Sequence, residues 1–240
     1  FASLVNVEIH GLLKLNVLGI IDSEDNYSES QCTVNSVRYY IKDSQENSLK
    51  RNIFKIANFN NVIINSFVIP KNYPNSTFLH IMRSTNVSIT NYQNTNIASS
   101  KSGSEIFCES ISELSISDVS IISSIENNNY YFLSATKFKE GANISINDCN
   151  FVNVGLFDLL DESFGDVRIS DCNIVSNKPI NTMGKPIYNL QIDDVVLNCQ
   201  EFIVNGVVTL NISDTTLTVA KNFDIKAEKL VIDDCLFNIS

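Results

Sequence analysis

The sequence predicts an all-β fold, a parallel β-helix (a solenoid) of about nine to ten coils, in a single domain over residues 1–240. Three observations predict it. An eight-residue phrase, written "VRISDCNI" at 167–174, returns with variations every 20 to 30 residues. At its centre stands an Asp, Asn or Ser, and the apolar–polar alternation of a strand shifts there by one residue. A second strand signal, which contains Phe, precedes most of these phrases.

The phrase "VRISDCNI" contains a corner of the backbone. Val167 and Ile169 are the apolar residues before Asp171, and Cys172 and Ile174 are those that follow it. In a straight strand this shift would place the second half on the opposite face. Both halves can face one interior if the chain turns at the central residue near the left-handed region, which Asp, Asn and Gly tolerate best. The pattern predicts such corners at Asp118, Asp148, Asp171, Asp194, Asp214 and Asp234, with looser copies at Gly11, Ser36, Ser66 and Asn91.

Each repeat also contains the strands that would complete one coil. Phe residues in apolar segments precede the corners by roughly 11 to 16 residues; they are Phe54, Phe78, Phe107, Phe132, Phe157, Phe202 and Phe223. A period therefore holds an aromatic strand, a second strand, a corner and a third strand. This is the content of one coil of a parallel β-helix, in which each coil stacks on the next. The polar stretches 41–52, 93–105 and 125–131 are expected to be loops.

The composition describes a folded, acidic chain. Its 240 residues carry a formal net charge of -10, and 44% of them are hydrophobic. Clusters of Lys and Arg that would neutralise phosphates are missing, so nucleic acid is not an expected partner. No apolar run is long enough for a bilayer span, so we expect no membrane insertion by this segment. The chain starts without Met and ends inside a repeat phrase, which suggests a fragment of a longer chain.

These repeats resemble the right-handed parallel β-helices of the pectin-lyase-like superfamily, and above all the Asn-rich β-helical regions of large surface or secreted proteins of single-celled eukaryotes. The resemblance covers nearly the whole chain, most clearly from Asn52 onward, and rests on the periodicity, the corner parity and the Phe ladder. It implies right-handed coiling. Because the superfamily includes lyases, hydrolases, adhesins and plain spacers, the fold alone does not indicate one function.

The Asp column has two interpretations. Stacked carboxylates about 5 Å apart could hold Ca²⁺, and the candidate metal ligands are the doubled acids Asp193, Asp194, Asp233 and Asp234. In the interpretation that we favour, Asp serves the corner, where its side chain can bond nearby backbone N–H groups. Ser, Asn and Gly replace Asp in the first four repeats, as a corner permits and a cation cage does not. We therefore expect no metal and no other cofactor.

The enzyme motifs of the superfamily are largely missing. Its polygalacturonases carry Asn-Thr-Asp, Asp-Asp, Gly-His-Gly and Arg-Ile-Lys in that order, and their carboxylates act across a glycosidic bond. Here a His-Gly pair precedes Asp193 and Asp194, and the first and last motifs do not occur. Its lyases use Ca²⁺ to neutralise a substrate carboxylate and an Arg or Lys as the base. Arg168, beside the acidic stretch 157–166, is the candidate catalytic residue, although such a stretch is usually a solvated face.

The six cysteines are Cys32, Cys108, Cys149, Cys172, Cys199 and Cys235. No pair has the Cys-x-x-Cys spacing and the two His are remote, which disfavours a zinc site. Cys149 and Cys172 occupy the same inward position on adjacent coils, where a Cα separation of about 4.8 Å would allow a somewhat strained disulfide. The alternative, which we favour, is two buried thiols that pack as small apolar residues.

Six Asn-x-Ser/Thr sequons are candidate N-glycosylation sites: Asn26, Asn75, Asn86, Asn143, Asn211 and Asn238. In a chain so rich in Asn and Ser, chance alone accounts for about as many, so the motif does not establish secretion. A column of small polar residues also precedes the corners and comprises Asn35, Asn65, Thr90, Ser117, Asn147, Ser170, Asp193, Ser213 and Asp233. We expect this column to be solvated, with glycan binding as the alternative.

These observations predict a non-enzymatic extracellular or cell-surface module, such as a stalk, an adhesin or an assembly component. Its expected partners are other protein subunits or further β-helix coils of the same protein. The alternative is a polysaccharide lyase-like or glycan-binding β-helix, whose partner would be a glycan.

Overall fold

The computed structural model describes residues 1–10, 15–18, 30–40, 54–69, 77, 79–97, 103–124, 130–136, 141–159, 164–181 and 187–240. Within these ranges the chain forms strands and tight turns without a helix, and every strand pairing is parallel. The same ranges contain no helix with the length and apolar character that a membrane span requires. The prediction of an all-β, parallel fold is confirmed.

The strands of the N-terminal half are β1 (Ala2–His10), β2 (Leu15–Leu18), β3 (Gln31–Tyr40), β4 (Phe54–Ala57), β5 (Asn61–Ile69), β6 (Leu79–Ile97), β7 (Gly103–Ser117), β8 (Ser120–Ser123) and β9 (Tyr130–Thr136). The strands that follow are β10 (Asn143–Asn147), β11 (Asn150–Val152), β12 (Gly155–Leu159), β13 (Phe164–Ser170), β14 (Asn173–Val175), β15 (Ile180–Asn181), β16 (Ile187–Asp193), β17 (Val196–Ser213), β18 (Thr216–Asp233) and β19 (Leu236–Ile239).

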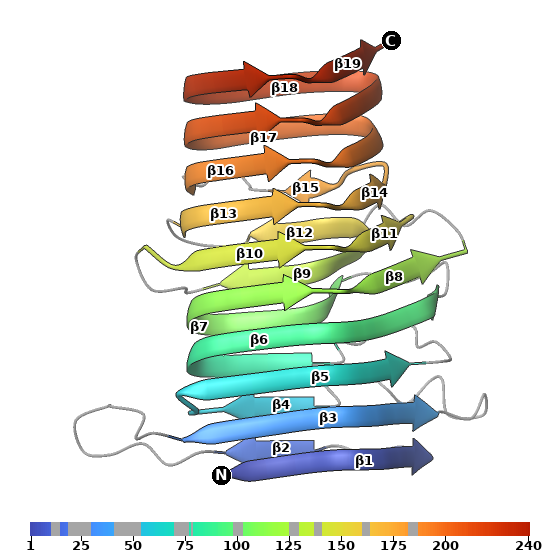
Figure 1. The fold of residues 1–240 in the computed structure, drawn as a ribbon, viewed down its shortest axis with the longest axis vertical. Coiled ribbons are helices and arrows are strands. Elements are labelled where there is room, and N and C mark those ends of the chain that lie inside the picture. The colour runs from blue at the N-terminus through green and yellow to red at the C-terminus, as the bar shows by residue number, and fades with distance from the viewer. Residues whose placement is uncertain are drawn as a thin grey trace.

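The strands stack along the long axis of the molecule, with the N-terminus at one end and the C-terminus at the other (Figure 1). In one row, β7 pairs with β10, β10 with β13, β13 with β16 and β16 with β17. A second row contains β8, β11 and β14, and a third contains β9, β12 and β15. The three strands of a repeat are separate in β10–β12 and merge into single long strands in β6, β17 and β18.

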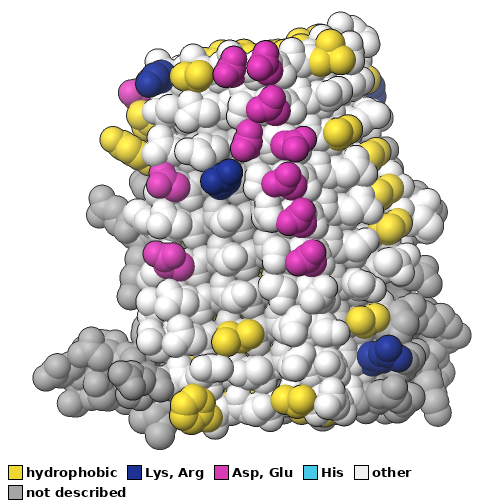
Figure 2. Space-filling model, viewed as in Figure 1, with side chains coloured by type: hydrophobic (Ala, Val, Ile, Leu, Met, Phe, Trp, Pro, Cys, Tyr) yellow, Lys and Arg dark blue, Asp and Glu magenta, His cyan; other side chains and the backbone are white. Residues whose placement is uncertain are grey.

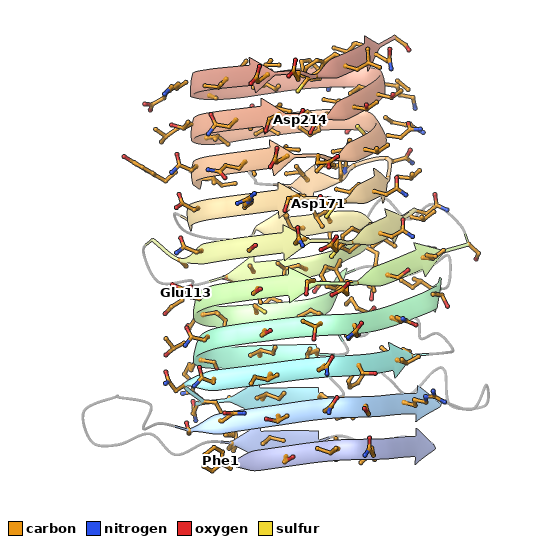
Figure 3. All side chains as sticks on the ribbon, in the orientation of Figure 1. Phe1, Glu113, Asp171 and Asp214 are labelled. Carbon is orange, nitrogen blue, oxygen red and sulfur yellow. The ribbon has the colours of Figure 1, made fainter. Side chains whose placement is uncertain are left out.

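The backbone has positive φ at each predicted Asp corner: Asp118 (53°), Asp148 (52°), Asp171 (52°), Asp194 (50°), Asp214 (47°) and Asp234 (45°). Ser36, Ser66 and Asn91 have the same conformation at 54°, 57° and 51°. Gly11 lies outside the described residues. Asn6, at 54°, instead lies opposite Ser36, between the paired residues that flank both. Asp171 and Asp214 lie toward the same side of the front strands in Figure 3.

The corner interrupts neither the ladder below it nor the ladder above it. The Asp171 amide donates to the carbonyl of Asp193 on the next turn, at 3.1 Å, and the Asn173 amide donates to the carbonyl of Cys149 on the preceding turn, at 2.9 Å. The Asp194, Asp214, Val196 and Thr216 amides donate in the same two directions. The turns that contain Asp171, Asp194 and Asp214 are therefore hydrogen-bonded to both neighbours where the chain bends, which satisfies buried backbone groups.

Inward positions on successive turns hold the same kind of side chain. The column before the corner is formed by Ile64, Ile89, Ile116, Ile146, Ile169, Ile192 and Ile212, all almost fully buried. Ser170, which the sequence places on a solvated column, is buried instead, and its hydroxyl donates to Asn147 Oδ1 at 2.7 Å. The prediction for Ser170 is wrong because a small hydroxyl beside a tight corner can be covered once it has a hydrogen-bond partner.

The aromatic residues form an interior stack, but the predicted Phe ladder is not one column. Ring centroids lie 5.3 Å apart between Phe54 and Phe67 and 5.4 Å apart between Phe67 and Tyr92. Farther along, those of Phe132 and Phe151 are 5.1 Å apart. Rings from strands before the corner (Phe54, Phe132) and after it (Phe67, Tyr92, Phe151) therefore contribute to one stack in the core.

Phe107 differs from the buried phenylalanines of the stack. Phe107 is only half-buried and packs edge-on against His80, at 5.0 Å between ring centroids, while its neighbour Ile106 takes the inward position. Phe107 therefore does not take the inward position of its strand, although either residue of the Ile-Phe pair satisfies the apolar pattern. Phe78 lies outside the described residues.

Two stretches predicted to be loops are partly strands. Residues 93–97 belong to β6, residues 103–105 to β7 and residues 130–131 to β9. Residues 41–52 lie outside the described residues. The loop prediction is wrong where polar side chains point inward, as Asn94 and Glu105 do, because they hide the apolar alternation.

Replacing Asp171 with Val tests the corner. A β-branched residue disfavours positive φ, so Asp171→Val should lower the free energy of unfolding by about 1–2 kcal/mol, whereas Asp171→Asn should leave it nearly unchanged. Urea unfolding followed by circular dichroism measures both. Asn173→Val is the matched control, because Asn173 is an exposed strand residue two positions away. Equal stability of Asp171→Val and Asp171→Asn would contradict a structural role of the conformation.

Candidate functional site

A shallow groove of about 540 Å³ runs across the sheet formed by β5, β6, β7, β10 and β13, which faces the viewer in Figure 1. Ser88, Ser115 and Ser145 line it in register, one per turn. Arg168, on the last of these strands, is the next residue in the same column. An uncharged hydroxyl row that ends in one cation is an arrangement that can hydrogen-bond an extended polar ligand.

One edge of the groove is a ladder of amides and carboxylates. Asn86 Nδ2 donates to Asn61 Oδ1 at 3.0 Å, and the backbone N–H of Asp166 donates to Asn143 Oδ1 at 3.3 Å. Glu113 lies in the same ladder, between Asn86 and Asn143, and on the side of the sheet away from Asp171 and Asp214 in Figure 3. These turn-to-turn bonds orient side chains that would otherwise be free on the surface.

The candidate catalytic residue Arg168 forms an ion pair with an Asp of the next turn. Its Nη2 atom lies 3.5 Å from Asp193 Oδ2, and the two side chains are 55% and 38% exposed. Asp193 Oδ1 accepts a hydrogen bond from Ser213 Oγ at 2.6 Å. Exposed pairs of this kind contribute about 0–1 kcal/mol. The structure thus brings Arg168 to Asp193 and Asp166, while Asp158 lies in β12, in another strand row.

The acidic candidates for metal binding are spread along two columns. Ser213 separates Asp193 from Asp233, and Asp214 separates Asp194 from Asp234. No group of three or more His, Cys, Asp or Glu side chains that could hold a metal occurs among the described residues. The carboxylates form a negative strip over the C-terminal half of the molecule (Figure 2), which raises the local concentration of cations.

A buried polar cluster, which sequence reasoning missed, lies between β6, β7 and β9. The Glu105 carboxylate is fully buried and accepts hydrogen bonds from the Tyr92 hydroxyl at 2.7 Å, from Asn94 Nδ2 at 2.9 Å and from the Tyr130 hydroxyl. A buried carboxylate is strongly unfavourable without such donors.

The two tyrosines of this cluster hold their protons tightly. Burial, reinforced by the Glu105 charge, raises the pKa values of Tyr92 and Tyr130 well above their ordinary range. Both hydroxyls therefore remain donors at any pH near neutrality. The cluster joins three strands of consecutive turns by side-chain hydrogen bonds within the core.

The sequons differ in accessibility. Asn86, Asn143 and Asn238 are exposed, and Asn211 is half-buried. Asn26 and Asn75 lie outside the described residues. Because Asn86 and Asn143 line the groove, a glycan on either would cover part of it.

Comparison of the chain with protein-family models, curated proteins and solved structures found no match. Two features of the chain bear on its function, the groove across the front sheet and the exposed edge at the C-terminal end of the stack.

Replacing Tyr130 with Phe tests the buried cluster. The variant removes one donor to Glu105 and should lower the free energy of unfolding by about 1–3 kcal/mol at pH 7. The raised pKa of Tyr130 has a second effect: above pH 10 the unfolded chain loses protons that the folded chain retains, so stability falls with rising pH. Urea unfolding at pH 7, 9 and 11 should show a smaller fall in Tyr130→Phe than in the wild type.

Tyr131→Phe is the matched control. Tyr131 is also buried in β9, and burial raises its pKa to about 12, but its hydroxyl is not one of the Glu105 donors named above. Its replacement should change stability at pH 7 by under about 0.5 kcal/mol. Equal losses for the two variants at pH 7 would show that Tyr130 acts through packing alone.

Proposed function

We propose that the chain is a right-handed parallel β-helix that serves as a non-enzymatic structural or adhesive module of an extracellular or cell-surface protein. Its three strand rows and the in-register corners from Asn6 to Asp234 support one coil per repeat. The path in Figure 1 supports the handedness, because front strands run from left to right and rear strands return while the chain rises toward the C-terminus. The resemblance to Asn-rich β-helices of the pectin-lyase-like superfamily points the same way.

The observation that carries the proposal is the exposed edge formed by β18 and β19. Ile212 is 1% exposed, and Ile232, in the same inward column one turn later, is 47% exposed. Val219 and Ile239 show the same contrast, with 0% and 54%. The side chains are of core type and occupy core columns, and they are exposed because no described strand lies above them.

Such an edge is suited to strand-upon-strand assembly. Covering the remaining half of each large apolar side chain would contribute about 1 kcal/mol, and the row of backbone groups on the edge can pair with another parallel strand. At the other end, Ala2, Leu4 and Val7 occupy inward columns and are half-buried. The matching partner is another subunit, or a further coil of the same protein, that continues these columns.

Self-association of the 240-residue chain tests this proposal. Sedimentation velocity from 1 to 200 µM, a range of roughly two decades suited to micromolar affinities, should show a sedimentation coefficient that rises with concentration. Ile232→Asp places a charge in the inward column and should abolish the rise. Leu236→Asp is the control, because Leu236 is equally near the edge, 58% exposed, and continues the outward column of Val196 and Thr216. A chain that is monomeric throughout, or equal behaviour of both variants, would contradict the proposal.

The alternative function is glycan binding or polysaccharide lyase activity, and the groove supports it. Arg168 stands at one end of the hydroxyl row, where its guanidinium can pair with a sugar carboxylate as it pairs with Asp193. The neighbouring Asp166 adds a second polar group on the same strand. Arg168 can therefore bind a sugar carboxylate without acting as the catalytic base of a lyase.

Incubation with polyuronates and Ca²⁺ separates these functions. The primary proposal predicts no absorbance from unsaturated products and no effect of Arg168→Ala on that baseline. Turnover that disappears in Arg168→Ala would overturn it in favour of a lyase. Saturable binding without turnover, weakened in Arg168→Ala, would favour a glycan-binding module.

A further inference from the structure

Cys149 and Cys172 form a unique pair among the six cysteines, all of which lie in described ranges. They occupy the first inward position after the corner on two successive turns, between the paired residues Asn147–Ser170 and Asn150–Asn173. Both side chains are almost fully buried as free thiols. The pairing of β11 with β14 thus places two reactive groups of the same kind face to face.

The other cysteines have no cysteine neighbour on an adjacent turn. Cys235 continues the column of Cys172, but the turns of Val195 and Thr215 stand between them, a separation of about 14 Å. Cys32 is paired in register with Ala2 and Val62, Cys108 with Ile81 and Ala135, and Cys199 with Val219. Geometry alone therefore selects one pairing out of the fifteen that six cysteines allow.

The backbone at the pair is fixed on both sides. The Asp148 amide donates to the Ser170 carbonyl at 3.3 Å, and the Asn173 amide donates to the Cys149 carbonyl at 2.9 Å. Parallel strands held in this way are about 4.8 Å apart, within the Cα separation of about 4.4–6.8 Å that disulfides adopt. Little backbone movement is needed to join the two sulfur atoms.

Both thiols already have backbone acceptors. Each donates to the carbonyl two residues before it, Cys149 to Asn147 and Cys172 to Ser170, both at 3.0 Å. These bonds hold the two S–H groups in equivalent positions on successive turns. Either sulfur can therefore make the first attack once it has lost its proton.

We propose that Cys149 and Cys172 are a redox-responsive modification site, at which a low-molecular-weight disulfide converts the thiol pair into a covalent link between two turns. The thiolate of one of the two cysteines attacks one sulfur of the disulfide and releases one thiolate as leaving group. The other cysteine then loses its proton and attacks the protein sulfur of this mixed disulfide, which releases the second. The protein loses two protons and two electrons, and the external disulfide is reduced to two thiols.

The link would act on the unfolded chain more than on the folded one. It closes a loop of 24 residues, counted from 149 through 172 inclusive, and so restricts the unfolded ensemble while leaving the native ladder in place. The oxidised module would be more resistant to unfolding than the reduced one. This property is independent of whether the module assembles or binds a glycan.

Both thiols are buried in the folded chain, where glutathione would reach them slowly. The site is therefore tested by refolding the chain in a glutathione buffer, followed by alkylation and peptide mapping. The expected result is a Cys149–Cys172 linked peptide, with the other four cysteines alkylated. The oxidised chain should have a thermal midpoint roughly 5–10 °C above that of the reduced chain. Cys149→Ala should abolish both effects, and Cys199→Ala, a buried cysteine without a cysteine neighbour, should retain both.

Three results would overturn the site: both cysteines alkylated after refolding, either cysteine carrying glutathione without a link, or a different pairing. A chain that does not refold would be tested in the folded state, by prolonged exposure to oxidised glutathione before the same mapping. In that experiment the oxidation is quenched and the chain is denatured before alkylation. A linked 149–172 peptide would support the site, and alkylation of both thiols would contradict it.

Discussion

The parallel backbone ladder from one turn to the next is the constraint on which the rest of this structure depends. A single turn cannot bury its apolar face, because inward residues such as Ile169 are covered by equivalents on the turns above and below, here Ile146 and Ile192. The ladder can continue only if strands on both sides of the corner face the same interior. Positive φ at Asp171 turns the chain so that both strands face the interior. The Asp171 amide still donates to the next turn, so the ladder continues through the corner.

The same constraint explains which features could be predicted from the sequence. The one-residue shift between Ile169 and Cys172 is visible without a structure, because period-two alternation marks strands and its interruption marks a bend. The corner at Asn6 was not predicted because Gly11, five residues later, follows an apolar alternation that imitates the corner pattern. The choice between Ile106 and Phe107 as the inward residue also needs the register, since both are apolar.

The buried Glu105 cluster shows where sequence reasoning fails for a physical reason. Polar residues at 93–105 resemble a loop, yet Asn94 and Glu105 lie inside and satisfy each other together with Tyr92 and Tyr130. Only partners distant in sequence make their burial favourable, and no local pattern records those partners. The same limit applies to Arg168, whose ion-pair partner Asp193 is 25 residues away.

The proposed functions follow from what stacking leaves exposed. On the outer face, stacking lines up hydroxyl, amide and carboxylate groups turn by turn, which produces the groove. It also produces the acidic strip, which Figure 2 shows. At the edge of the stack it exposes core-type residues such as Ile232 and Ile239. Inside, it places Cys149 against Cys172. The proposed recognition, assembly and covalent link would thus be three consequences of one repeated geometry.

Amide hydrogen exchange, read by mass spectrometry at low protein concentration, tests most directly the claim that each turn is completed by its neighbours. The account predicts strong protection in β13 and β16, which are paired on both edges, and weak protection in the last turn, residues 230–239, which is paired on one edge. Protection of the last turn should rise with protein concentration as copies stack upon it. Equal protection of β16 and residues 230–239 at low concentration would contradict the account.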